Sequence, residues 1–122
     1  MADDRPSSPL STQVFQILLS LVDDDLHGYA IIQDVGARTE GEVRLTASTL
    51  YAAIKRLLET GWIVEVRRRP SVDDDARRRY YHLTTQGRQA ARAEALRLDR
   101  LAAMARAKRL IPASRIVKPA SS

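Results

Sequence analysis

Apolar residues recur at helical spacing in the first part of the chain. The first helix is predicted to begin near Ser11 or Thr12, whose hydroxyls can cap free backbone N–H groups, and to end at Asp23–Asp25. Its apolar positions form two adjoining rows, Val14, Ile17, Leu18 and Leu21 in one and Phe15, Leu19 and Val22 in the other. A small domain needs one such face, so the second row indicates either a centrally buried helix or contact with a partner chain.

Two more helices are predicted before position 62. The second runs from about Tyr29 to Thr39, and the third starts at a cap, Thr46 or Ser48, and ends at Gly61, where a terminating glycine is common. The apolar rows that would face the core are Ile31, Ile32 and Val35 in the second helix, and Leu50, Ile54, Leu57 and Leu58 in the third.

The other face of the third helix has hydroxyls and cations but no carboxylate before Glu59. It carries Ser48, Tyr51, Ala52 and Lys55, with Arg56 beside them. Such a face can lie in the major groove of DNA, with hydroxyls and lysine on phosphates and the alanine on a thymine methyl. A solvated helix face has the same composition, so this pattern by itself leaves both interpretations open.

A β-hairpin is predicted after the third helix. Its strands are Trp62–Arg67 and Arg77–Leu83, joined by a turn over Arg69–Ala76, with Tyr81 and Leu83 on one side of the returning strand. Three helices followed by a basic hairpin is the order of a winged helix–turn–helix, in which the third helix enters the major groove. The arginines near the turn repel one another, and DNA phosphates would relieve that repulsion.

The last predicted helix runs from about Thr85 to Leu110. A narrow row of mostly small residues repeats at heptad spacing and suits close helix approach: Ala91, Ala95, Leu98, Ala102 and Ala105, with Leu101 alongside. We expect this helix to need a partner, and the second row of the first helix in another copy of the chain is the predicted surface. A membrane-surface helix is disfavoured, because arginines surround the helix and aromatic anchors are lacking.

The distribution of charge along the chain indicates the kind of partner that the protein binds. The chain has 122 residues, enough for one domain, and is 44% hydrophobic, with a net charge of +5 and a pI near 10.1. Residues 1–45 carry 3 basic and 8 acidic side chains, residues 46–85 carry 8 and 5, and residues 86–122 carry 9 and 2. Positive charge therefore accumulates after position 46, where a nucleic-acid surface would lie.

Several function classes are not supported by the sequence. No cysteine is present, which excludes disulfides, thiolate zinc sites and cysteine nucleophiles. The run Asp23–Asp25 with His27 reads as a polar turn, since consecutive residues rarely converge on one ion, and His82 is expected at the surface or facing phosphate. No spacing suggests a catalytic pair or a phosphate-binding glycine loop, so we expect no enzyme, metal or cofactor. Without a membrane span or a signal peptide, a soluble cytoplasmic protein is expected.

Several motifs, in order, resemble the PadR-like transcriptional regulators over about residues 10–110. The matching stretches are Leu26–Tyr29, Thr49–Tyr51 with Lys55–Leu57, Gly61–Ile63, and Arg78–Thr84 with Gly87. The resemblance implies a homodimeric winged-helix DNA-binding protein, usually a repressor, whose C-terminal helix makes the dimer. It also implies a small phenolic or drug-like effector. Trp62 is expected in the core, and its alternative role is that of an aromatic wall in an effector pocket. The short C-terminal part resembles the branch with a single dimerisation helix.

Two departures from the family pattern bear on DNA reading. Relatives often have Pro-Gly before the Ser/Thr-Leu-Tyr motif and Pro after it, where this chain has Ala47, Ser48 and Ala52. Alanine leaves the third helix unkinked, so base readout is expected to differ. The predicted wing tip carries Asp73–Asp75, which would repel phosphate, so either the tip points away from DNA or the strand arginines make the contacts.

The sequence thus predicts a mostly α fold with a small β-hairpin wing, a winged helix–turn–helix followed by a long C-terminal dimerisation helix. The expected divisions are a flexible tail over 1–9, a DNA-binding domain over 10–85, a dimerisation helix over 86–110 and a flexible tail over 111–122. The expected partners are a second copy and double-stranded operator DNA with inverted-repeat symmetry; a winged helix used only for protein–protein assembly is the alternative. The predicted DNA contacts are Ser48, Thr49, Tyr51, Lys55, Arg67, Arg68, Arg77, Arg78 and Arg79.

Overall fold

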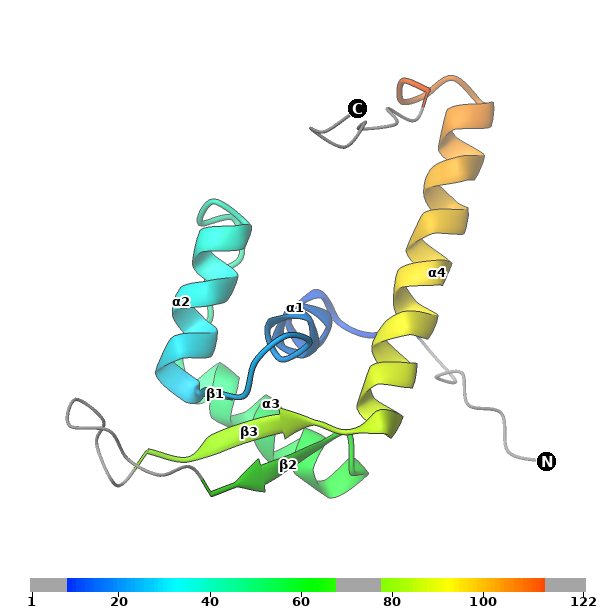
Figure 1. Ribbon diagram of the computed structural model, residues 1–122. Coiled ribbons are helices and arrows are strands. Elements are labelled where there is room, and N and C mark those ends of the chain that lie inside the picture. The colour runs from blue at the N-terminus through cyan, green and yellow to red at the C-terminus, as the bar shows by residue number, and fades with distance from the viewer. Residues whose placement is uncertain (1–8, 68–77, 114–122) are drawn as a thin grey trace, which may run out of the picture.

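The computed structural model describes residues 9–67 and 78–113 and shows four helices and three strands within them (Figure 1). In chain order these are α1 (Thr12–Ser20), β1 (Leu26–His27), α2 (Gly28–Arg38), α3 (Ala47–Thr60), β2 (Ile63–Val66), β3 (Tyr80–Leu83) and α4 (Thr85–Ala107). The predicted mostly α fold with a small hairpin and a long last helix is confirmed. The predictions for Arg68, Arg77, Asp73–Asp75 and most of both tails lie outside the described residues.

Side-chain caps begin the helices where the sequence predicts them. Ser11 Oγ accepts the backbone N–H of Val14 at 3.1 Å, and Thr46 Oγ1 accepts that of Thr49 at 3.1 Å. At the other end of α3, Gly61 has φ of 79°, in the left-handed region that glycine adopts without steric cost.

Three helices have bounds that differ from the predicted ones by one to several residues. Helix α1 ends at Ser20, before the aspartates, because the N–H groups of Leu21 and Val22 bond back three residues and tighten the chain into a turn. Helix α2 starts and ends one residue earlier than predicted, since His27 is its cap. Helix α4 ends at Ala107, where the chain turns through Arg109 with φ of 62°.

A third strand, β1, was not predicted. The sheet is antiparallel with the order β1-β3-β2, and β1 pairs Leu26 with Tyr81 and His27 with Tyr80. Two residues are too short to show the alternation by which a strand is recognised in sequence. This strand joins the start of α2 to the hairpin.

The core lies where α1, α2 and α3 meet the sheet. The fully buried large side chains come from all of these elements: Ile17, Leu18, Ile31, Val35, Leu50 and Ile63. One expectation fails at its edge, since Leu58 is 38% exposed rather than buried. Tyr80 is buried as well, although it lies on the opposite side of β3 from Tyr81. The sheet therefore has a partly covered second side.

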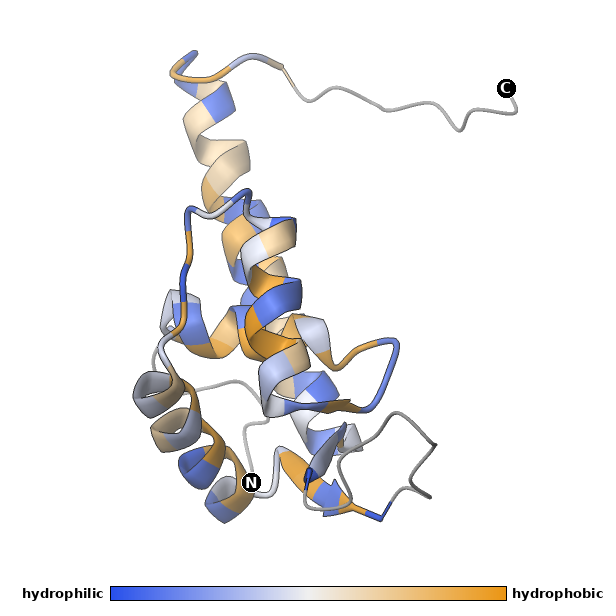
Figure 2. Ribbon diagram, turned by 90° about the vertical axis from the view of Figure 1, so that its left-hand side faces the viewer, coloured by the Kyte–Doolittle hydropathy of each residue, from blue (hydrophilic) through white to orange (hydrophobic). Residues whose placement is uncertain are grey.

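Helix α4 packs on α1 only through its first turns. Ala90 and Ala91 are buried there, and Ala91 joins the core cluster. The last turns of the helix extend past the other elements, as Figures 1 and 2 show from two directions. Ala91, predicted to face a partner chain, is therefore covered by its own chain, and the exposed part of the predicted row begins at Ala95.

The start of α4 is held close to the end of α3. Thr84 caps α4 by accepting the N–H of Gly87 at 3.0 Å, and the Thr84 hydroxyl donates to the carbonyl of Gly61 at 2.7 Å. Gly87 lies so near the carbonyl of Trp62 that a Cβ at this position would overlap it, and the Leu83 side chain would be 2.8 Å away. Only glycine permits this approach.

We therefore expect Gly87→Ala to lower the free energy of unfolding by about 1–3 kcal/mol, because backbone rather than a flexible side chain must move. The control is Gly36→Ala in α2, whose added Cβ would meet no atom within 4 Å. That change should leave stability unchanged or raise it by up to about 1 kcal/mol. Urea denaturation measures both, and equal effects would contradict the close approach at Gly87.

A buried carboxylate ties α4 to the segment before α1. Glu94 is 3% exposed and accepts two hydrogen bonds from Arg97, at 2.9 and 2.6 Å, and one from the N–H of Leu10 at 3.4 Å. The hydrogen bonds from Arg97 lower the pKa of Glu94 against the opposing effect of burial. The charged carboxylate therefore stabilises the folded chain above its ordinary pKa of 4.5.

This stabilisation should be lost as the pH falls through the lowered pKa of Glu94. The free energy of unfolding of the Glu94→Gln variant is accordingly expected to vary less between pH 5 and pH 3 than that of the wild type. Denaturant titrations at several pH values measure it, with the exposed Glu59→Gln as the control. A wild-type slope retained by Glu94→Gln would show that this group does not carry the effect.

Candidate nucleic-acid interface

The polar face of α3 is open to solvent. Ser48, Thr49, Lys55 and Arg56 are all exposed. In the first turn, Thr46 Oγ1 donates to Thr49 Oγ1 at 2.9 Å and lies 3.3 Å from Ser48 Oγ, which gathers three hydroxyls at the start of the helix. These groups can donate to or accept from base edges and phosphates, and the Lys55 ammonium lies two turns further along.

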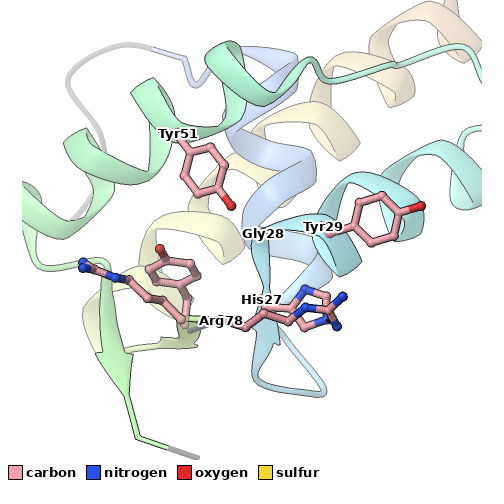
Figure 3. Close-up of a pocket in the computed structure, with 7 residues that line it drawn as sticks. His27, Gly28, Tyr29, Tyr51 and Arg78 are labelled. Atoms are coloured by element: carbon pink, nitrogen blue, oxygen red, sulfur yellow. Dashed lines mark hydrogen bonds between the residues drawn. The ribbon is translucent and has the colours of Figure 1, made fainter. Parts of the chain in front are cut away.

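Tyr51 leaves this face and leans toward α2. Figure 3 shows its ring reaching from α3 toward Gly28, and a Cβ on Gly28 would overlap the Tyr51 hydroxyl. Gly28 is thus the residue that lets the tyrosine lie against the start of α2. The ring remains 50% exposed, so its hydroxyl can still meet a ligand from solvent.

Tyr51 is one wall of a hollow of about 350 Å³ between α2, α3 and the wing, here called the wing–α2 hollow. It is lined by His27, Gly28, Tyr29, Tyr51, Arg78, Arg79 and Tyr81. His27 and Arg78 lie side by side in it, with Nε2 of the imidazole 3.1 Å from Nη1 of the guanidinium (Figure 3). The hollow thus combines cationic, imidazole and phenolic groups from three elements.

Charge around this hollow is mostly positive. Arg79 is well exposed and only loosely paired, its Nη1 lying 3.5 Å from the Glu65 carboxylate. Burial raises the pKa of Tyr81 above its ordinary value, and the neighbouring Tyr51 and Glu65 add to the rise while Arg79 opposes it. Tyr81 therefore stays a neutral hydrogen-bonding phenol at neutral pH.

Arg67 does not line the wing–α2 hollow. It lines a separate hollow of about 570 Å³ that also includes Asp23, Asp24 and Asp25. His82, on the same side, is exposed as expected, but its Nδ1 contacts the Asp25 carboxylate at 2.7 Å. Three carboxylates therefore share this hollow with Arg67, His82 and Arg88. Because Val66 pairs with Tyr80, the backbone of Arg67 lies close to that of Arg79, although Arg67 does not line the wing–α2 hollow.

The predicted dimer residues differ in their exposure. On α1, Phe15, Leu19 and Val22 are half-buried within this chain. On α4, Leu98 is 40% and Leu101 is 47% exposed, and Ala102 and Ala105 are half-buried. Further apolar side chains that sequence reasoning did not include are exposed near them: Leu96, Met104, Leu110 and Ile111.

Trp62 packs against the core, and it also lines a mostly apolar hollow. This hollow of about 320 Å³ lies between the segment before α1 and the inner side of α3, where Leu10, Val14 and Leu57 contribute apolar walls. The role of Trp62 in an effector pocket stays a prediction, and this hollow is the cavity in which it would act.

Sequence reasoning missed His27 as a site residue. Its position directly before Gly28 signals a helix cap, because imidazole can accept a backbone N–H as other capping side chains do. Its closeness to Arg78, 51 residues further along the chain, has no signal in local sequence.

Comparison with known proteins identifies the family. The model of the "Transcriptional regulator PadR-like family" matches residues 17–93, which include α2, α3 and the wing strands. The chain belongs to the PadR-like family. Its members are transcription regulators and not enzymes, which confirms the expectations drawn from the motifs. An uncharacterized protein X of Lysinibacillus sphaericus is 33% identical over 72 residues, and the match covers 59% of this chain and 64% of that protein.

Solved structures of transcription regulators share this fold. A PadR family transcription regulator from Clostridium difficile R20291 has a TM-score of 0.66 at 24% identity, covering 79% of this chain and 96% of that one. The PcaV transcriptional regulator of Streptomyces coelicolor, in complex with its natural ligand, has a TM-score of 0.61 at 25% identity, covering 78% of this chain and 60% of that one. The winged-helix architecture is therefore confirmed.

The described residues also bear on membrane insertion and on metal binding. Within 9–67 and 78–113, no helix is long and apolar enough to cross a membrane. In the same ranges, no three acidic or histidine side chains come together in a way that could hold a metal ion.

Proposed function

We propose that this PadR-like protein is a homodimeric, sequence-specific DNA-binding repressor whose α3 enters the major groove. The observation that carries the proposal is the exposed hydroxyl and lysine face of α3, together with the wing–α2 hollow, where Tyr51 of α3 lines the same space as Arg78 and Arg79 of the wing. A regulator of transcription acts where the chromosome lies, so we assign it to the cytoplasm.

Roles follow from position and chemistry. Ser48, Thr49 and Lys55 project from the first three turns of α3 and are assigned to base edges and nearby phosphates, with Tyr51 as a further DNA contact. Arg78 and Arg79 are assigned to phosphates. Arg67 is left out of this set, because it lines a hollow with Asp23, Asp24 and Asp25 in its wall, and a phosphate there would face these carboxylates as well.

The part of α4 beyond Glu94, whose apolar side chains are exposed, supports the proposed dimer. Leu98 and Leu101 lie in an exposed apolar row that this chain does not cover, and burial of such side chains is worth about 1.5–3 kcal/mol each. A two-fold dimer presents two recognition helices about 34 Å apart, so the preferred operator is an inverted repeat.

The effector is proposed as a small aromatic molecule in the hollow beside Trp62. That hollow lies against Ala53 and Leu57 on the inner side of α3, so an occupant there would press on the recognition helix. The ligand-bound PcaV relative supports effector binding in a chain of this fold. Repression follows from a dimer that occupies the operator and is released when the effector shifts α3.

DNA binding should separate positioning contacts from reading contacts. If the dimer neutralises about eight phosphates, log K should fall with log salt at a slope of about −7. Arg79→Ala should weaken binding to every duplex and lower the slope by about one for each phosphate that is no longer neutralised. Ser48→Ala and Lys55→Ala should instead change the preferred sequence, by about 1–3 kcal/mol per base contact.

These effects are measured by titrating duplexes selected from a random pool at two salt concentrations. Arg92→Ala, which removes the same charge from an exposed position on α4, serves as the control for Arg79→Ala. Equal behaviour of wing and α3 variants would contradict the assigned roles. A wild-type protein that selects no sequence would favour the alternative of a protein–protein module.

The dimer surface is tested by Leu98→Asp, which places a charge in both copies of the α4 row. Because Leu98 is already 40% exposed in the single chain, the variant should fold, while the dimer should weaken by more than about 100-fold. Sedimentation equilibrium at micromolar concentration measures this, and Gln89→Asp adds the same charge to an exposed position nearer the start of α4 as the control. A Leu98→Asp dimer as stable as the wild type would exclude this surface.

A further inference from the structure

The chain carries nearly all of its positive charge on arginine. Of its 20 basic side chains only three are lysines, Lys55, Lys108 and Lys118. The first stands on the polar face of α3, and Lys108 follows the last turn of α4. The face that we assign to the major groove therefore holds the one lysine of residues 1–107.

The amine of Lys55 is exposed and has no protein partner. Within the part of the chain that the structure describes, it makes no hydrogen bond or ion pair. Glu59, one turn further along α3, does not pair with it, and a lysine that precedes the glutamate is the weaker order for such a pair. Arg56, the next residue of the helix, is likewise exposed and unpaired among the described residues.

Lysine differs from arginine because acylation removes its charge. An unprotonated amine attacks a carbonyl carbon and becomes a neutral amide, whereas a guanidinium stays protonated in proteins. An amide on Lys55 would no longer attract a phosphate, and its acyl group would stand on the face that meets the base edges. An arginine at this position would supply the same charge without this sensitivity.

The surroundings of Lys55 favour a negatively charged acyl donor. Lys55 and Arg56 are adjacent cations without a carboxylate partner in the described chain, so anions are concentrated around them and neutral molecules are not. Acyl phosphates combine a reactive carbonyl carbon with a doubly charged phosphate as the leaving group.

We propose that Lys55 is an acylation site that takes acetyl groups from acyl phosphates, and that its acetylation releases the protein from DNA. The unprotonated amine forms a C–N bond to the acetyl carbon, the C–O bond to phosphate breaks, and inorganic phosphate leaves with the electron pair of that bond. The nitrogen then gives its extra proton to water, and a neutral amide remains. This inference rests on the proposed DNA binding and adds a means of regulating it.

The test is to treat the full chain with acetyl phosphate at pH 8. Peptide mass spectrometry measures the acetylated fraction at Lys55, and titration of the duplex that each protein selects gives its affinity before and after treatment. The wild type should lose about tenfold in affinity for each Lys55 acetylated, as for one hydrogen bond to a charged group, and about 100-fold for a dimer acetylated in both copies.

Two variants identify the amine that is responsible. Lys55→Arg keeps the charge but offers no amine, so treatment should leave its own untreated affinity unchanged. Lys108→Arg removes an exposed lysine from the far end of α4 and is the matched control; on treatment it should lose as much affinity as the wild type. Losses caused by any other amine would appear in treated Lys55→Arg.

Two rate measurements test the position of Lys55 and the class of donor. A saturating duplex should slow the acetylation of Lys55, while Lys108 reacts as fast as in the protein without DNA. Arg56→Gln should slow the reaction of Lys55 with acetyl phosphate about threefold, but not its reaction with the neutral acetyl donor N-acetoxysuccinimide.

Each contrary result has a distinct meaning. Acetylated wild type that binds as tightly as untreated protein, or equal losses in wild type and Lys55→Arg, would overturn the inference while leaving DNA binding intact. The absence of acetylation at Lys55 would do the same, and equal slowing of both donors by Arg56→Gln would overturn the assignment to acyl phosphates. A wild type that selects no duplex before treatment would overturn the proposed function, and the regulation with it.

Discussion

The short ladder between β1 and β3 fixes the geometry of the side of the protein that we propose to face DNA. Only two residue pairs form it, Leu26 with Tyr81 and His27 with Tyr80. Because β1 runs directly into α2, this pairing places the first turn of α2 beside the returning strand of the wing. The wing–α2 hollow exists because of that placement.

Close backbone approach at two glycines lets the same region pack. Gly28 leaves room for the Tyr51 ring, which links α3 to the start of α2, and Gly87 leaves room for the Trp62 carbonyl, which links α4 to the end of α3. Neither glycine needs a left-handed backbone conformation, so each is required for space rather than for a turn. Helix α3, the proposed recognition helix, is thus held at both ends by contacts that a methyl group would disturb.

Helix α4 combines two roles along its length. Its first turns belong to the core through Ala90 and Ala91, and Glu94 ends this part with hydrogen bonds to Arg97 and Leu10. Beyond that point its apolar side chains are exposed, which a chain of this size tolerates poorly without a partner. A dimer built on this half would be rigidly connected to the DNA-binding side.

The sequence by itself determined the helices, their caps and the family. Local rules sufficed for Ser11, Thr46 and Gly61, since capping depends on a few neighbouring residues. The tertiary structure decided which side chains meet: the pairing of His27 with Arg78, the turning of Tyr51 toward Gly28, and the burial of Ala91. His27 and Arg78 are 51 positions apart in the chain, and Gly28 and Tyr51 are 23 apart. Strand β1 brings these residues together, but its two residues are too few to show a periodic pattern in the sequence.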